Sequence, residues 1–140
     1  LKTIPELHIH KGKFLTKKIH RPIIGQSQSY VFVNDTEEKG SDVNLASHLL
    51  MDGFCDSYDV ALVMSQDTDL LEAMRMVRDD LNKEIVVAWF DGSDPGKKHK
   101  KVASAIRHVT NGMLTRSQFP NPVIGRGGKK IYRPENWDFE

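Results

Sequence analysis

The feature that most constrains the fold is a strand, helix, strand pattern in the middle of the chain. Residues 59–65 (DVALVMS) form a nearly continuous apolar run, which is typical of a strand covered on both faces of a parallel sheet. Residues 85–90 (IVVAWF) predict a second buried strand. Between the two runs, apolar residues recur at the spacing of an amphipathic helix: Leu70, Leu71, Met74, Val77 and Leu81. A parallel crossover of this kind predicts an α/β fold with a layered sheet.

The flanking segments carry weaker signals. Residues 7–10 alternate apolar and polar side chains, and residues 30–33 are prone to β structure, so we expect two short strands joined by a basic loop. Ser41 is placed to cap a helix that stops near Gly53. The basic run 97–101 predicts a short helix reaching about residue 106, and residues 119–140 are expected to be an irregular tail.

Composition indicates one globular domain over residues 1–140. The chain is 39% hydrophobic and 28% charged, which is ordinary for such a domain. Its longest apolar run is six residues, residues 85–90, and the N-terminus lacks an apolar signal-peptide core, so we expect a cytoplasmic protein. The single cysteine, Cys55, excludes an internal disulfide and a multi-cysteine metal site, and we expect it to be a small buried filler.

The charges are strongly segregated along the chain. Residues 1–34 carry six basic and one acidic side chains, residues 35–94 carry four and fifteen, and residues 95–140 carry ten and three. An acidic centre with basic flanks suits a site in which carboxylates bind a cation and lysines and arginines bind a polyanion. An acidic, solvated surface explains the same pattern without any site.

Two acidic residues fall where a ligand site is expected. Asp67 and Asp69 follow a buried strand and precede a helix, and ligands of open α/β sheets bind outside the carboxyl ends of the strands. Two close carboxylates favour a cation, and Mg²⁺ prefers oxygen ligands. The structural alternative is that Asp67 or Thr68 caps the helix while Asp69 interacts with the helix dipole. Asp42, just after the Ser41 cap, has the same alternative.

Several short motifs together resemble the NYN domain family, LabA-like members of the PIN-like nuclease superfamily. The motifs cover most of the chain and lie at residues 38–46 (EKGSDVNLA), 48–52 (HLLMD), 61–70 (ALVMSQDTDL), 117–122 (SQFPNP) and 133–137 (RPENW). The resemblance implies a PIN-like, Rossmann-like layered fold, with a mainly parallel central sheet flanked by helices and acidic residues gathered at the strand ends.

The resemblance also implies a metal-dependent ribonuclease with Mg²⁺ or Mn²⁺ as cofactor and RNA as substrate. Asp42, Asp67 and Asp69 match the catalytic and metal-binding acids, Ser65 the small polar residue that ends the strand, and Lys39 a lysine that contacts substrate phosphate. Bound metal would polarise the phosphate and activate a water.

The chain departs from the family pattern at its start, where it begins with Leu1. The family's opening strand with its Asp-Gly-x-Asn-like end is not found, so we expect an N-terminally truncated domain that is weakly active or inactive. A second copy of the chain or a separate N-terminal fragment is then expected to complete the sheet.

Basic and aromatic residues suggest where RNA would lie. Lys97 and Lys98 are expected to contact phosphates and Tyr132 to stack on a base, whereas Trp89 is expected in the core. Two other functions fit less of the pattern. One is a non-catalytic RNA-binding or regulatory module, and the other is a phosphatase of the haloacid dehalogenase type, which Asp67, Thr68 and Asp69 superficially resemble.

Overall fold

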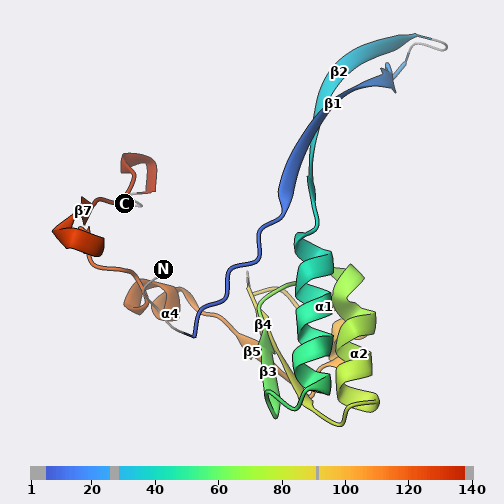
Figure 1. Cartoon of the computed structure of the whole chain (residues 1–140). Helices are drawn as coiled ribbons and strands as arrows, with labels where there is room; N and C mark the ends of the chain where they lie inside the picture. The colour runs from blue at the N-terminus through green and yellow to red at the C-terminus, as the bar shows by residue number, and fades with distance from the viewer. Residues whose placement is uncertain (1–5, 26–28, 91, 138–140) are drawn as a thin grey trace.

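The body of the molecule is an α/β unit built on a parallel sheet. The computed structural model describes residues 6–25, 29–90 and 92–137. Strands β3 (Val60–Val63), β4 (Glu84–Trp89) and β5 (Ala105–His108) form a three-stranded sheet in the order β3-β4-β5, with both pairs parallel. Helices α1 (Ser41–Phe54) and α2 (Leu71–Asp79) lie side by side against this sheet (Figure 1). The predicted crossover between the two central strands is confirmed.

The core lies between the sheet and its helices. Met74 and Val77 on α2 and Ile85 and Val87 on β4 are fully buried, because the apolar stripe of the helix faces the apolar run of the strand. Trp89 is buried as expected, and its indole Nε1 donates a hydrogen bond to Ser93 Oγ at 3.1 Å. These contacts hold α2 on β4 and tie the end of β4 to the loop that follows it.

Helix α1 begins one residue away from the predicted cap. Gly40, rather than Ser41, is the N-cap residue, and its φ of 98° lies in the left-handed region that glycine adopts at little cost. At the other end, Tyr58 folds back on the helix and donates a hydrogen bond to the Leu49 carbonyl at 2.6 Å. Gly53 leaves room for this ring, because a Cβ there would lie 2.7 Å from the Tyr58 hydroxyl oxygen.

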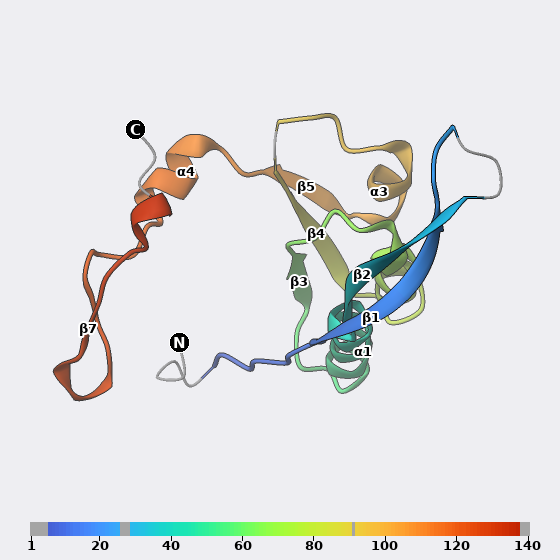
Figure 2. The same cartoon turned by 90° about the horizontal axis from the view of Figure 1, so that it is seen from above.

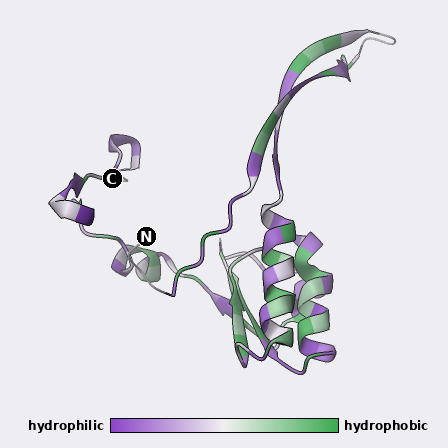
Figure 3. Cartoon of the chain, in the orientation of Figure 1, coloured by the Kyte–Doolittle hydropathy of each residue, from purple (hydrophilic) through white to green (hydrophobic). Residues whose placement is uncertain are grey.

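An antiparallel hairpin, which we call the arm, extends away from the body (Figures 1 and 3). It consists of β1 (Lys13–Pro22) and β2 (Tyr30–Lys39), paired from Lys13↔Lys39 to Pro22↔Tyr30. The predicted basic loop is therefore wrong, since most of it is a strand. The predicted strand at residues 7–10 is also wrong, because these residues form an irregular segment that runs beside α1.

The C-terminal part leaves the body after β5 (Figure 2). Helix α3 (Lys97–Val102) ends earlier than expected, because residues 105–108 join the sheet as β5. Beyond it lie α4 (Asn111–Arg116), the short strands β6 (Val123–Ile124) and β7 (Lys130–Ile131), and the single turns η2 (Arg126–Gly128) and η3 (Glu135–Trp137). Strands β6 and β7 pair antiparallel with each other.

The predicted fold class is confirmed at its coarse level, as a mixed α/β fold with a parallel sheet flanked by helices. The other two sheets are small and antiparallel, and the PIN-like layering stays a prediction. Cys55 is exposed, so its predicted role as a buried filler is wrong. In the described ranges, no helix has the length and apolar character needed to cross a membrane.

Candidate functional site

A pocket with several charged side chains, the acidic pocket, lies where the arm meets the body. It has a volume of about 330 Å³ and is lined by Glu38, Lys39, Gly40, Asp42, Val43, Ala46, Asp69 and Leu70. Two segments far apart in sequence meet there: residues 38–46, which run from the end of β2 into α1, and the turn η1 (Thr68–Leu70) that follows β3. The pocket thus lies beyond the carboxyl end of β3, which is where ligands of α/β sheets bind.

The loop between β3 and α2 is held by its own hydrogen bonds. The Asp67 amide donates to Ser65 Oγ at 3.2 Å, and the Asp69 amide donates to Asp67 Oδ1 at 2.9 Å. Gln66 Nε2 donates to the Phe90 carbonyl at 3.2 Å, which ties the loop to the end of β4. Asp67 therefore caps η1, as the structural alternative proposed, while Asp69 lines the acidic pocket.

One cationic side chain lies beside these carboxylates. Lys39 Nζ is 3.0 Å from Glu37 Oε2, and Lys17 Nζ is 3.1 Å from the same oxygen. The pKa of Glu37 is lowered, first by the hydrogen bond from Lys39 and then by that from Lys17. Lys39 lines the acidic pocket, and its ammonium group is paired with Glu37. An anionic group that enters the pocket would therefore compete with Glu37 for this ammonium group.

The predicted site residues divide among three places. Lys39, Asp42 and Asp69 line the acidic pocket together, and Ser65 and Asp67 lie in the adjoining loop. Lys97 and Lys98 form the start of α3, outside the lining of this pocket. Tyr132 lines a separate pocket of the C-terminal part, of about 220 Å³, together with Phe119 and Trp137.

The predicted metal triad is not assembled in the described residues. Asp42 and Asp69 line the pocket, but the Asp67 carboxylate accepts the Asp69 amide instead. No group of three or more His, Cys, Asp or Glu side chains in this part of the chain is arranged to hold a metal ion. These residues do not fit a three-carboxylate site for Mg²⁺ or Mn²⁺, and metal binding here stays a prediction.

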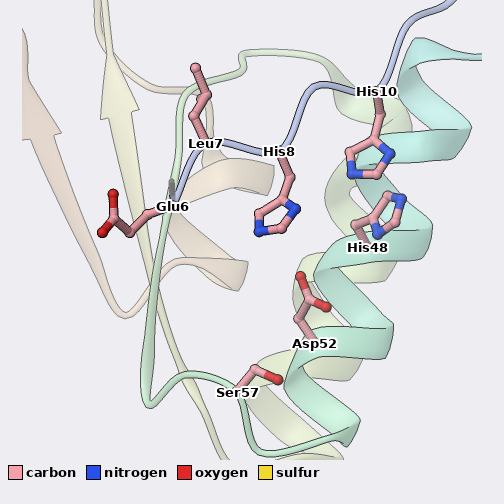
Figure 4. A pocket seen from close by; sticks show the side chains of 7 residues that line it. All are labelled: Glu6, Leu7, His8, His10, His48, Asp52 and Ser57. Carbon is pink, nitrogen blue, oxygen red and sulfur yellow. The ribbon is translucent and has the colours of Figure 1, made fainter. Parts of the chain in front are cut away.

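A second pocket, the histidine pocket, was not expected from the sequence (Figure 4). It has a volume of about 690 Å³ and lies between the irregular N-terminal segment and α1. The His10 and His48 rings stack with centroids 3.6 Å apart and planes tilted by 32°. Asn44 Nδ2 also donates to the Lys11 carbonyl at 3.5 Å, so two contacts hold the segment on the helix.

The histidine pocket combines aromatic faces with acids and bases. Its lining is Glu6, Leu7, His8, His10, His48, Asp52 and Ser57. The one sequence signal for it is the spacing of His48 and Asp52, four residues apart and therefore on one face of a helix. The pocket lies near residue 57, which precedes β3, and so at the amino end of the sheet rather than at its carboxyl end.

Comparison with known proteins gives one relative. A protein of Pseudomonas putida, named 6-hydroxy-3-succinoylpyridine 3-monooxygenase HspA, is 32% identical to this chain over 105 residues. The match covers 72% of this chain but only 33% of the relative, so the chain spans about a third of the length of the curated protein that it matches. Neither a family model nor a solved structure matches the chain.

This relative corrects the predicted function. Its name describes an enzyme that inserts oxygen into a substituted pyridine, not one that cleaves RNA. The ribonuclease was implied by the resemblance to the NYN family, whose acids match Asp42, Asp67 and Asp69. Carboxylates at the end of a strand serve proton transfer and substrate binding equally well.

Proposed function

We propose that this chain is part of an oxygenase that acts on a hydroxylated N-heteroaromatic acid, and that the acidic pocket binds this substrate. The observation that carries the proposal is the 32% identity over 105 residues with an enzyme named for oxygen insertion into a hydroxypyridine. The chain covers 33% of the length of that enzyme. That this chain takes part in the whole oxygenation reaction is therefore itself proposed.

The lining of the acidic pocket suits such a substrate. A succinoyl chain ends in a carboxylate, for which Lys39 supplies an ammonium group. A hydroxypyridine ring offers O–H or N–H donors, for which Asp42 and Asp69 supply acceptor oxygens. Val43, which is 68% exposed, provides apolar surface for the ring. The volume of about 330 Å³ falls at the lower end of the range for small-molecule sites.

The carboxylates have a chemical role in this scheme. Monooxygenation forms one bond from carbon to an oxygen atom of O₂, and the other oxygen atom leaves as water after taking two electrons and two protons. A ring that has lost its hydroxyl proton is richer in electrons and reacts more readily with an electrophilic oxygen. We assign Asp42 or Asp69 to holding that proton in the bound substrate.

The position of the pocket favours it over the histidine pocket. The acidic pocket lies at the carboxyl edge of the parallel sheet, and its residues come from three separate elements, as is usual for ligand sites in α/β folds. The same edge supports the finer fold proposal, a PIN-like layered arrangement of the NYN type, for which the parallel β3-β4-β5 order is the favourable observation.

Calorimetric titration of the chain with 6-hydroxy-3-succinoylpyridine tests the proposal. We expect binding that Lys39→Ala and Asp69→Asn each weaken roughly tenfold, because each removes a charged partner of the substrate. The matched control is Asp59→Asn, since the Asp59 side chain is almost fully exposed and is not among the lining residues.

Two results would contradict the proposal. One is the absence of binding by the unmodified chain. The other is binding that Asp59→Asn weakens as much as Asp69→Asn does, because the effect would then come from net charge and not from the pocket. Substrate-dependent O₂ consumption, with NADH or NADPH as reductant and Asp69→Asn as comparison, extends the test to the reaction.

A further inference from the structure

The acidic pocket carries more negative than positive charge. Of its described lining residues, Glu38, Asp42 and Asp69 carry carboxylates, and Lys39 carries the one ammonium group. This ammonium group is paired with Glu37, which is not a lining residue, at 3.0 Å. An anionic group placed among the three carboxylates would be repelled, because like charges at short range oppose each other. An anionic ligand therefore fits this pocket only with its charged end turned toward Lys39.

The part of the arm next to Lys39 is rich in lysine. Lys13 on β1 lies directly opposite Lys39 in the register of the arm, so the two side chains share one face. Side chains in such positions have Cβ atoms roughly 4.5–5.5 Å apart. Lys17 lies on the same face of β1, and its Nζ is 3.1 Å from Glu37 Oε2. We call these four residues the arm base: Lys13, Lys17, Glu37 and Lys39.

The arm base has an excess of positive charge. Three ammonium groups share the one carboxylate of Glu37, so three positive charges and one negative charge leave a formal charge of +2. In the described ranges, Lys13 has no ion-pair partner of its own. Like charges directly opposite each other on two strands are destabilising. A ligand carboxylate bound between Lys13 and Lys39 would remove this repulsion.

Glu37 competes for the same ammonium group. Hydrogen bonds first from Lys39 and then from Lys17 lower the pKa of Glu37, so its carboxylate is ionised at neutral pH. A ligand carboxylate must therefore displace Glu37 from Lys39. Because Lys17 contacts the same oxygen atom, Glu37 keeps a cationic partner after this exchange.

We propose that the arm base makes the acidic pocket selective for a substrate with a carboxylate on its side chain. Lys13 and Lys39 together bind this carboxylate, and Glu37 opposes its binding by competing for Lys39. The ring lies by Asp42 and Asp69, and the charged chain points toward the arm. The inference rests on the proposed function, because it concerns the same substrate in the same pocket.

The test compares two ligands by calorimetric titration. One is 6-hydroxy-3-succinoylpyridine, and the other is its methyl ester, which keeps the ring but lacks the charged end. The ratio of the dissociation constant of the ester to that of the acid measures the selection for the carboxylate, and we expect a ratio above one. Lys13→Gln should lower this ratio roughly threefold and Glu37→Gln should raise it roughly threefold, since an exposed ion pair changes affinity by at most about fivefold.

Two control variants change the net charge outside the arm base. Arg21→Gln removes a positive charge from the same face of the arm, eight residues from Lys13 along β1 and thus roughly 27 Å away. Asp59→Asn removes a negative charge from an almost fully exposed position on the body. Neither substitution should change the ratio. Binding of the ester checks that each variant is folded, because it needs the acidic pocket but neither Lys13 nor Glu37.

The possible results separate this inference from the proposed function. If neither ligand binds the unmodified chain, both are overturned. If both ligands bind but Lys13→Gln and Glu37→Gln leave the ratio unchanged, only this inference is overturned. The same holds if Arg21→Gln lowers the ratio as much as Lys13→Gln does. Changes of the ratio in opposite directions on Lys13→Gln and Glu37→Gln support the inference, because a general loss of stability would not change it in opposite directions.

Discussion

The contact between Gly53 and Tyr58 gives a prediction whose sign can be worked out from the structure. An added Cβ at Gly53 would lie 2.7 Å from the Tyr58 hydroxyl oxygen and 3.2 Å from Leu81 Cδ1. The hydroxyl cannot move freely, because it donates to the Leu49 carbonyl at 2.6 Å. Gly53→Ala therefore forces the ring away and breaks that hydrogen bond.

Gly53→Ala changes the free energy of unfolding through a favourable helix propensity and two unfavourable contacts, which can be compared. Alanine is favoured over glycine inside a helix by about 1 kcal/mol, and by less in the last turn, where Gly53 lies. Overpacking costs about 1–3 kcal/mol, and a lost hydrogen bond costs about 0.5–1.5 kcal/mol. We expect Gly53→Ala to lower the free energy of unfolding by about 1–3 kcal/mol, measured by urea denaturation followed by circular dichroism.

A double-mutant cycle isolates the cause. In a Tyr58→Phe background the nearest atom is gone, so Gly53→Ala should cost at least about 0.5 kcal/mol less than in the unmodified chain. Gly112→Ala in α4 is the control, because a Cβ there meets nothing nearer than 3.5 Å. An increase in stability on Gly53→Ala, or additive effects in the cycle, would refute the reasoning.

Three further predictions concern stability. Met74→Ala should lower the free energy of unfolding by about 2–5 kcal/mol, because Met74 is fully buried. Met76→Ala, on the more exposed side of α2, should lower it by less than about 1 kcal/mol. Equal losses of stability in urea denaturation would contradict this. Asp67→Ala should lower the free energy of unfolding by about 1 kcal/mol through loss of the η1 cap. Asp67→Asn should lower it by less, because asparagine keeps an acceptor oxygen. The reverse order would be inconsistent with capping. Burial, and secondarily Asp52, raises the pKa of Tyr58 above its ordinary 10.0, so the folded state holds this proton more tightly than the unfolded state. The contribution of this proton to the free energy of unfolding is complete below pH 10.0 and is lost as the pH rises through the higher pKa of the folded state. Tyr58→Phe should remove this part of the loss of stability at alkaline pH.

The body of the fold was predictable because burial leaves a pattern in the sequence. The runs at residues 59–65 and 85–90 and the helical spacing from Leu70 onward correspond to β3, β4 and η1 with α2. On the exposed side of α2, Arg75 pairs with Glu72 at 2.8 Å and with Asp79 at 3.8 Å, at the three- and four-residue spacings that bring side chains together on a helix. The predicted strand at residues 30–33 is confirmed as the start of β2. Strand β1 was missed because the arm extends away from the core, so no buried face imposes alternation on it.

The candidate site was predictable only in part. The strand-end rule located Asp69, and the N-terminal position of Asp42 on its helix brought it to the same pocket. That Asp67 would use its carboxylate to cap η1 depends on local backbone geometry, which spacing does not determine. The histidine pocket depends on packing of the N-terminal segment against α1, a contact between residues almost forty positions apart, such as His10 and His48.

The most direct test of the proposed function maps substrate binding residue by residue. The amide resonances of the ¹⁵N-labelled chain are followed while 6-hydroxy-3-succinoylpyridine is added. Binding in the acidic pocket predicts saturable shifts concentrated at residues 38–46 and 68–71, with the Asp69→Asn chain responding only at higher concentrations. Shifts confined to the histidine pocket around His8, His48 and Asp52, or no saturable shifts at all, would contradict the account.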